Sequence, residues 1–267
     1  MAQLEETKNL VLTERRGQST LVLKLNRPAK RNALSQALID SLLHELENAS
    51  TDPRIYSVVI TGSDTIFSAG ADIEEISRMN AQGARQRRYL EDLCHGMERF
   101  CKPLIAAVEG KALGGGFELA LMADFVVAAR DADFRLPETS IGLIPGAGGT
   151  QRLTAAIGKY RAMNMILLHK ALSGEEASSA GLVSKLVAKG QALSAALEIA
   201  EKLASQSLPT VVLAKEAICR ADHRRHDHAY ERSLYYSAFG TRDMVEGVTA
   251  FLEKRVPVWE SQVSHNP

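Results

Sequence analysis

Short runs of apolar residues, each ended by a turn residue or a charge, recur through the first half of the chain. They occupy residues 21–25, 58–62, 104–108 and 125–128. The first of them stops at an Asn-Arg-Pro sequence, which is typical of a turn. Short apolar runs bounded in this way predict buried strands.

Apolar positions at helical spacing lie between these runs. Ser35 is placed to cap a helix running to about Asn48, whose buried face would carry Leu38, Leu42, Leu43 and Leu46. Residues 116–122 have a helical pattern as well. Strands that alternate with helices predict an α/β architecture rather than a barrel of hairpins.

The pattern changes after about residue 190. Strand-like runs become rare, and Leu193, Leu197, Ala200 and Leu203 recur at helical spacing. Pro209 opens a further helix through Val212, Leu213 and Ile218, and the later segments are amphipathic and charged. We therefore predict an α/β core over residues 1–200 and a helical C-terminal region over residues 201–267.

Charge narrows the function classes. The 267 residues include 32 Lys and Arg and 32 Asp and Glu, so the formal net charge is +0. Such a chain has no global field that attracts nucleic acid or an anionic membrane, and an anionic ligand would need local basic residues. No apolar stretch approaches the roughly 20 residues that span a bilayer. We expect neither a nucleic-acid partner nor a membrane.

The cysteines and the N-terminus bear on the compartment. Cys94, Cys101 and Cys219 have no metal-ligand spacing and fit reduced thiols in a cytosol-like environment. Residues 1–6 contain an acidic pair and no basic region followed by an apolar run, so we expect no secretory signal. The expected location is cytoplasmic.

Three consecutive glycines, residues 114–116, lie between a predicted strand and a predicted helix. Without Cβ atoms they let backbone approach a ligand closely. The unpaired N–H groups and the dipole of the helix start would polarise a carbonyl oxygen, and Glu118 follows in the first turn. The alternative is a tight turn followed by an ordinary carboxylate. A dinucleotide site fits less well, because the G-x-G-x-x-G spacing is not met.

Two further segments hold candidate chemistry. The small residues of segment 67–73 could bring another backbone N–H to the same pocket, or the segment is a loop in which Asp72 caps a helix. Segment 136–150 supplies a second carboxylate, Glu138, and a glycine-rich loop before a predicted helix from Thr150. Two carboxylates on one pocket can add water by acid/base chemistry, while the alternative for Glu138 is a solvated turn residue.

Together these segments resemble the crotonase (enoyl-CoA hydratase/isomerase) family. The stretch IAAVEGKALGGGFELALMADF, residues 105–125, is similar to the family signature at every required position. Other segments resemble family segments in the family order: residues 26–34, 67–72, 144–153, 180–183 and 251–255. The resemblance runs from about residue 10 to residue 256, and a match of several motifs in order is specific.

The resemblance implies a fold and an assembly. Members of the family form a spiral of ββα units with a helical C-terminal region. That region trimerises, often as a dimer of trimers. The implied partners are an acyl-CoA thioester substrate and further copies of the same chain.

The resemblance also implies roles for single residues. The N–H groups of Ala71 and Gly115 correspond to the oxyanion hole for the thioester oxygen. Glu118 and Glu138 match the two catalytic glutamates, of which the first activates water and the second protonates the α-carbon. Gly146 matches a glycine whose N–H holds the water oxygen.

The remaining expected substrate contacts also follow from the resemblance. Lys30, Phe251 and Lys254 fall in segments that contact the phosphates and adenine of coenzyme A, and a position across a subunit boundary is left open for the last two. In the segment after the second strand, the substrate-binding residues are Ala69, Asp72 and Ile73. Coenzyme A is part of the substrate, so no separate cofactor and no metal is expected.

Two features depart from the pattern or stay outside it. Relatives usually have Gly where this chain has Arg135, whose guanidinium would meet an acidic substrate tail, lower the pKa of Glu138, or simply be solvated beside Asp133. We favour the solvated pair. The ligand-type residues of segment 222–228 are interpreted as a solvated helical face rather than a metal site.

Three function hypotheses result. The first is an enoyl-CoA hydratase, which the presence of both glutamates favours, because family isomerases commonly work with one acid/base group at the position of Glu138. The second is another family reaction, namely double-bond isomerisation, dehydration of a specialised acyl-CoA, or decarboxylation. The third, an RNA-binding protein on the same scaffold, is disfavoured by the neutral charge.

Overall fold

The computed structural model describes residues 9–223 and 228–259, and two sheets organise this part of the chain. The larger sheet has six strands in the order β1-β2-β3-β5-β7-β10, of which only β1 and β2 are antiparallel neighbours. Its strands are β1 (Val11–Arg16), β2 (Thr20–Leu25), β3 (Ser57–Thr61), β5 (Leu104–Val108), β7 (Phe125–Ala129) and β10 (Lys185–Val187).

The smaller sheet has four very short strands in the order β4-β6-β8-β9. They are β4 (Ile66–Ser68), β6 (Lys111–Leu113), β8 (Asp133–Arg135) and β9 (Leu172–Ser173). The pairs β4–β6 and β6–β8 are parallel, and β8–β9 is antiparallel.

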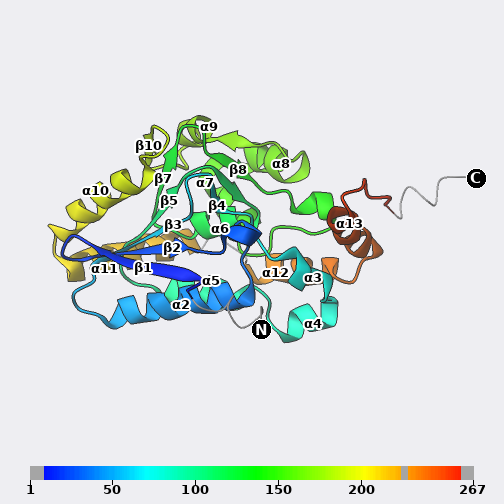
Figure 1. The fold of residues 1–267 in the computed structure, drawn as a ribbon, viewed down its shortest axis with the longest axis horizontal. Helices are drawn as coiled ribbons and strands as arrows, with labels where there is room; N and C mark the ends of the chain where they lie inside the picture. The colour runs from blue at the N-terminus through cyan, green and yellow to red at the C-terminus, as the bar shows by residue number, and fades with distance from the viewer. Residues whose placement is uncertain (1–8, 224–227, 260–267) are drawn as a thin grey trace, which may run out of the picture.

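From β3 to β8, successive strands belong alternately to the larger and the smaller sheet. Each pair β3/β4, β5/β6 and β7/β8 gives one strand to each sheet and is followed by helical segments. The order β3-β5-β7 in the larger sheet therefore repeats as β4-β6-β8 in the smaller one. This is the spiral of ββα units that the resemblance implied, and the α/β prediction is confirmed (Figure 1).

The described helices and 3₁₀ turns cover these sheets. They are η1 (Pro28–Lys30), α2 (Gln36–Thr51), α3 (Ile73–Ser77), α4 (Ala81–Gln86), α5 (Glu91–Arg99), α6 (Gly115–Leu121), η2 (Glu138–Ile141), α7 (Gly149–Ile157), α8 (Lys159–Leu167), α9 (Gly174–Ser179), α10 (Ala192–Ala204), α11 (Leu208–His223), α12 (His228–Ala238) and α13 (Arg242–Glu253). Helix α10 and helix α13 lie at opposite ends of the molecule in Figure 1.

Burial on both faces explains why the central strands read as continuous apolar runs. In β3, Val58 and Ile60 point into the main core, while Val59 points to the opposite face. That opposite face packs on the alanines of α10, such as Ala196 and Ala200. Small residues let the helix approach the sheet closely, so α10 closes the second core.

The predicted elements match the structure closely where their patterns are long. The strand over residues 104–108 is found at those bounds, and the Ser35 side chain accepts a hydrogen bond from Leu38 N at 3.4 Å, as a cap should. The capped helix ends at Thr51, three residues later than expected. Helix α10 runs across residue 200, and the domain division placed there stays a prediction. None of the described helices is long and apolar enough to cross a membrane.

Candidate active site

The glycine run forms a sharp connection between β6 and α6. Gly114 has φ +51, in the left-handed region that favours glycine, and a Cβ on it would lie 2.8 Å from Glu138 Oε1. A Cβ on Gly116 would lie 2.6 Å from the Ser68 carbonyl oxygen. The run is therefore required on two sides, because it brings the start of α6 against both the end of β4 and the second carboxylate.

The two backbone groups expected to form an oxyanion hole are neighbours. A Cβ on Gly115 would lie 3.3 Å from the backbone nitrogen of Ala71. The segment that carries Ala71 is fixed by a hydrogen bond from Leu34 N to Gly70 O at 2.7 Å. Gly115 is the first residue of α6, where N–H groups have no partner within the helix. The two donors therefore sit side by side at one place on the pocket wall.

A small enclosed pocket, with a volume of about 60 Å³, lies in front of these donors. Seven of the residues singled out in the sequence line it: Ala69, Ala71, Ile73, Gly115, Glu118, Glu138 and Gly146. The rest of the wall is largely apolar and includes Ile76, Leu90, Leu143 and Tyr235. Residues from between positions 69 and 146 and from α12 thus meet at a single cavity that holds two carboxylates.

Glu118 is almost completely buried, with 1% of its surface exposed. Its Oε1 accepts hydrogen bonds from Ala147 N at 2.8 Å and from Gly149 N at 2.7 Å. Burial, and then the negative charge of Glu231, raise the pKa of Glu118 to about 8, against the lowering effect of these two N–H groups. The carboxyl is therefore held in a fixed direction and can lose its proton near neutral pH.

Glu138 has a different environment. It opens the 3₁₀ turn η2, and its Oε2 is buried without a hydrogen-bond partner among the described residues. Burial, and then the charge of Glu118, raise the pKa of Glu138 well above the ordinary carboxyl value. No donor supports its ionised form at Oε2, so Glu138 keeps its proton while Glu118 loses one. The two carboxyls are suited to opposite roles, a base and an acid.

A third buried glutamate, Glu231 of α12, was not found in the sequence. Its Oε1 accepts from Gly148 N at 2.6 Å, and its Oε2 accepts from Thr150 N at 2.8 Å and from the Thr150 hydroxyl. In the sequence it is one charge in an amphipathic helix. Its spacing of four from Tyr235, which lines the pocket, places both on one helix face, but this signal appears only once Tyr235 is known to point inward.

Four predicted substrate contacts do not line this pocket within one chain. Asp72 pairs with Arg27 and caps α3 by accepting from Glu74 N at 3.0 Å, which is the alternative left open for it. Lys30 pairs with Glu74 at the surface. Phe251 and Lys254 lie near the end of α13 and are exposed.

Arg135 pairs with Asp133 through two hydrogen bonds, at 2.7 and 2.9 Å, on the exposed side of β8. The favoured interpretation, a solvated ion pair, is confirmed. The ligand-type residues of segment 222–228 lie partly outside the described residues, at 224–227. Within residues 9–223 and 228–259, no three His, Cys, Asp or Glu side chains gather as a metal site would need.

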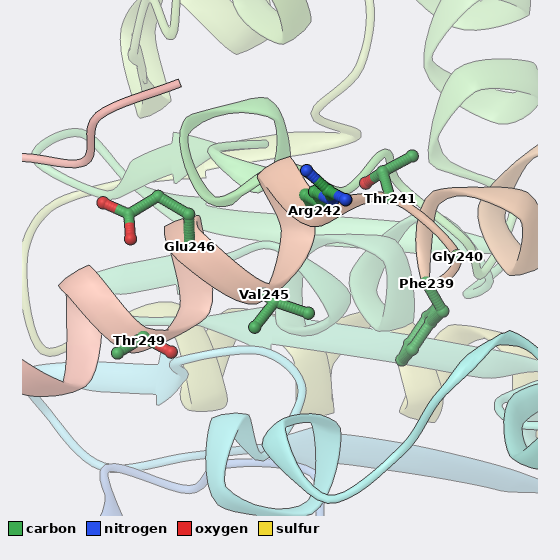
Figure 2. A pocket seen from close by; sticks show the side chains of 7 residues that line it. All are labelled: Phe239, Gly240, Thr241, Arg242, Val245, Glu246 and Thr249. Carbon is green, nitrogen blue, oxygen red and sulfur yellow. The ribbon is translucent and has the colours of Figure 1, made fainter. Parts of the chain in front are cut away.

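A larger, more open hollow of about 360 Å³ lies along α13, away from the glutamates. Figure 2 shows its lining, with Val245, Glu246 and Thr249 on the helix and Phe239 beyond its start. Glu246 there is paired with Arg255 at 2.5 Å. Glu246 is the one carboxylate among the described residues that line the hollow, and it is paired, so the smaller pocket with two carboxylates is the candidate active site.

Comparison with known proteins shows the family to which the chain belongs. The family model described as enoyl-CoA hydratase/isomerase matches residues 15–262. A probable mitochondrial enoyl-CoA hydratase of Dictyostelium discoideum is 44% identical over 94% of this chain and 90% of its own length. The 2,3-dehydroadipyl-CoA hydratase of Escherichia coli K12 is 43% identical over 91% of this chain and 95% of its own.

Solved structures give the same result. The crystal structure of carnitinyl-CoA hydratase from Mycobacterium avium superposes with a TM-score of 0.81 at 33% identity, covering 95% of this chain and 99% of that one. A structure named enoyl-CoA hydratase from Bacillus anthracis has a TM-score of 0.74 at 36% identity, with coverage of 94% and 99%.

Proposed function

Because the chain belongs to the enoyl-CoA hydratase/isomerase family, we propose from its site that it is an enoyl-CoA hydratase. It adds water syn across the double bond of a 2-trans-enoyl-CoA and gives a 3-hydroxyacyl-CoA. The observation that carries this proposal is the pair of buried glutamates on one pocket, beside two adjacent backbone donors. The acyl-CoA thioester is the substrate, and coenzyme A enters as part of it, so we propose no separate cofactor.

The geometry supports a division of labour in the addition. The thioester oxygen would accept hydrogen bonds from the N–H groups of Ala71 and Gly115, which stabilise the negative charge that develops there. Glu118 takes a proton from water as the water oxygen bonds to C3. The electron pair of the double bond moves toward C2, which receives a proton from Glu138. Gly146, on the pocket wall, would hold the attacking water through its N–H.

The direct test is a substrate panel with the purified protein. We expect loss of the conjugated enoyl-thioester absorbance with crotonyl-CoA, and a product 18 mass units heavier, as addition of one water requires. Short, long, branched and aromatic enoyl-CoAs in the same assay would give the acyl preference. A protein that adds no water to any of them, but shifts a double bond or releases CO₂, would have another reaction of the family.

We further propose that the chain assembles as a trimer or a dimer of trimers. Leu213 and Ile218 on α11 and Phe251 on α13 leave large apolar side chains exposed in a single chain. Phe251 and Lys254 also do not line the pocket, which is consistent with coenzyme A contacts made across a subunit boundary. The role of Lys30 at the coenzyme A phosphates is part of the same proposal.

The pathway and the compartment are proposals of the same kind. Degradation of a fatty acid or a related acyl-CoA would use a hydratase of this type. A cytoplasmic location is supported by the three cysteines, Cys94, Cys101 and Cys219, all of which are unpaired.

A further inference from the structure

The 147–150 loop consists of residues 147 and 148 and the first two residues of α7, Gly149 and Thr150. It is held between two carboxylates that come from different parts of the chain. Its four successive N–H groups alternate in direction. The first and third donate to Glu118, on α6, while the second and fourth donate to Glu231, on α12. The hydrogen bonds that the loop donates to Glu231 therefore fix its position relative to Glu118.

Holding the loop with a buried carboxylate has a free-energy cost that a neutral side chain would avoid. Glu231 is only 2% exposed, and its charge lies close enough to Glu118 to raise the pKa of that carboxyl. Burying a second charge beside the first adds desolvation and repulsion, whereas neutral groups could tie down a loop without either. Three donors, two N–H groups and the Thr150 hydroxyl, offset part of that cost at Glu231.

Helix α12 makes a second contact just before this loop, at Gly146. Tyr235, one helical turn after Glu231, packs so closely on Gly146 that a Cβ there would lie 2.5 Å from the ring. Gly146 is the residue expected to hold the attacking water. The helix thus contacts the 147–150 loop through the carboxylate of Glu231 and the preceding Gly146 through the ring of Tyr235.

We propose that Glu231 is a positioning residue for hydration: it fixes the 147–150 loop so that alternate N–H groups hold the carboxylate of Glu118 in the orientation of a base. Glu231 does not line the pocket and does not contact the substrate. Its effect passes through the loop to Glu118. This inference rests on the proposed hydratase function and adds to it a residue on a distant helix.

Several charged or titratable groups face Glu118, and they affect its pKa or have their own pKa affected by its charge. Burial is the largest cause of the raised pKa of Glu118; beyond it, the charge of Glu231 from α12 raises this pKa and Arg152 from α7 lowers it. Burial is also the largest cause of the raised pKa of Glu138 from η2, of Tyr235 from α12 and of Cys94 from α5, and the charge of Glu118 raises each of them further. Two effects of Glu231 are therefore opposed: its charge raises the pKa of Glu118, while the loop that it positions supplies the N–H groups that lower it.

Two variants separate these effects. Glu231→Asp keeps the charge but is shorter, so the loop shifts, the N–H bonds to Glu118 weaken, and the acid limb of the kcat–pH profile moves to higher pH. Glu231→Gln removes the charge and puts an amide N–H₂ against a backbone donor, so the loop shifts without the repulsion. Its acid limb lies at lower pH than that of Glu231→Asp. Both should lose about 10²-fold in kcat with KM changed less than about 3-fold, as expected for a misplaced catalytic group.

A matched control shows that the effect is specific to the loop. Glu109 is also a buried glutamate that accepts a backbone N–H, from Ala192 at 2.8 Å, but at the start of α10. Glu109→Gln should leave the acid limb at its wild-type pH. Coincident limbs in wild type, Glu231→Asp and Glu231→Gln, with kcat falling only as the folded fraction falls, would show a purely structural role and overturn the proposal.

A milder variant covers the case in which neither change at Glu231 yields folded protein. Thr150→Val removes one hydroxyl donor and keeps the backbone N–H. We expect kcat to fall about 3- to 10-fold at unchanged KM, because a charged hydrogen bond that holds the loop is lost. Wild-type kcat in a folded Thr150→Val protein would count against the positioning role. If wild type itself hydrates no enoyl-CoA, the proposed function fails, which is a different result from hydration that is indifferent to Glu231.

Discussion

At the scale of single residues, the site is decided by how many donors each buried carboxyl receives. Glu231 receives three, Glu118 receives two on one oxygen, and the Oε2 of Glu138 receives none among the described residues. Donors stabilise the ionised form, so this order predicts where the shared protons reside. We therefore expect Glu138 to act as the acid and Glu118 as the base, for reasons that can be traced to backbone N–H groups rather than to residue type.

Replacing either catalytic glutamate by Gln tests this assignment. Gln keeps the size and part of the hydrogen bonding but cannot exchange a proton near neutral pH. Glu118→Gln and Glu138→Gln should each lower hydration of crotonyl-CoA by roughly 10²–10⁴, with KM much less affected. The double variant should lose little more than the worse single one, because the two groups act as a unit. A severe loss for Glu138→Gln with a mild one for Glu118→Gln would instead indicate an isomerase.

The same burial predicts a stability effect that depends on pH. The pKa of Glu118 is about 8 in the folded chain and near 4.5 when unfolded, so the folded state binds the extra proton between these values. The contribution of Glu118 to stability is therefore fully present below about pH 4.5 and is lost as pH rises through 8. Glutamine does not titrate, so the Glu118→Gln variant does not lose stability in this way as the pH rises. Its free energy of unfolding relative to wild type should rise by about 3–4 kcal/mol from pH 5 to pH 8.

Calorimetry at several pH values would measure this difference. A gain of about 3–4 kcal/mol corresponds to a melting temperature higher by roughly 10 °C at pH 8 than at pH 5, relative to wild type. Glu47→Gln, on the exposed side of α2, is the control and should show no such trend. A difference between Glu118→Gln and wild type that stays constant over this range would contradict the raised pKa.

At the scale of elements, what could be predicted depended on the length of the pattern. The larger sheet follows from its apolar runs, because strands buried on both faces leave a continuous signal. The strands of the smaller sheet have two or three residues each, too few to show any alternation, so β4, β6, β8 and β9 were not predicted. Glu231 was missed for a related reason: only tertiary packing turns one charge on α12 inward.

The site itself was predictable where backbone determines it. The glycine run and the segment around Ala71 indicated adjacent N–H groups before any geometry was known, and the structure brings them together. The contacts of Lys30, Asp72, Phe251 and Lys254 depended on resemblance alone. Side-chain reach and subunit arrangement are not encoded in local spacing, so their roles stay predictions.

The start of α6 gives a test of the oxyanion donors. Gly115→Pro removes one N–H at the first position of a helix, where Pro is tolerated, and should lower turnover by about 10²–10³. Any side chain at this position also crowds Ala71 N, which would lie 3.3 Å from the new Cβ. Gly115→Ala is therefore the control, since it adds the same crowding but keeps the N–H. After both are shown to fold, equal losses in the two variants would rule out this N–H as an important donor.

At the scale of the whole molecule, the C-terminal helices leave several large apolar side chains exposed. Leu203, Val211 and Val212 are half-buried, whereas Leu213 and Ile218 expose 66% and 69% of their surface. Beyond them, Phe251 exposes 58% and Val256 83%. Exposed apolar side chains of this size are typical of faces that another subunit covers, and they occur both on α11 and at the end of α13. Because Phe251 and Lys254 lie at the end of α13, we expect assembly through that face to be linked to coenzyme A binding.

Light scattering on the purified protein should give a trimer or a hexamer at micromolar concentration. Ile218→Asp puts a charge on the exposed side of α11 and should shift the protein toward monomer, because an unpaired charge in an interface is costly. Leu12→Asp, on the edge strand β1 and outside the C-terminal region, is the matched control and should keep the wild-type mass. If coenzyme A binds across a boundary, the dissociated variant should show a raised KM for crotonyl-CoA, while kcat falls less, since Glu118 and Glu138 lie within one chain. A wild-type protein that is monomeric at this concentration would overturn both the assembly and the shared role of Phe251 and Lys254.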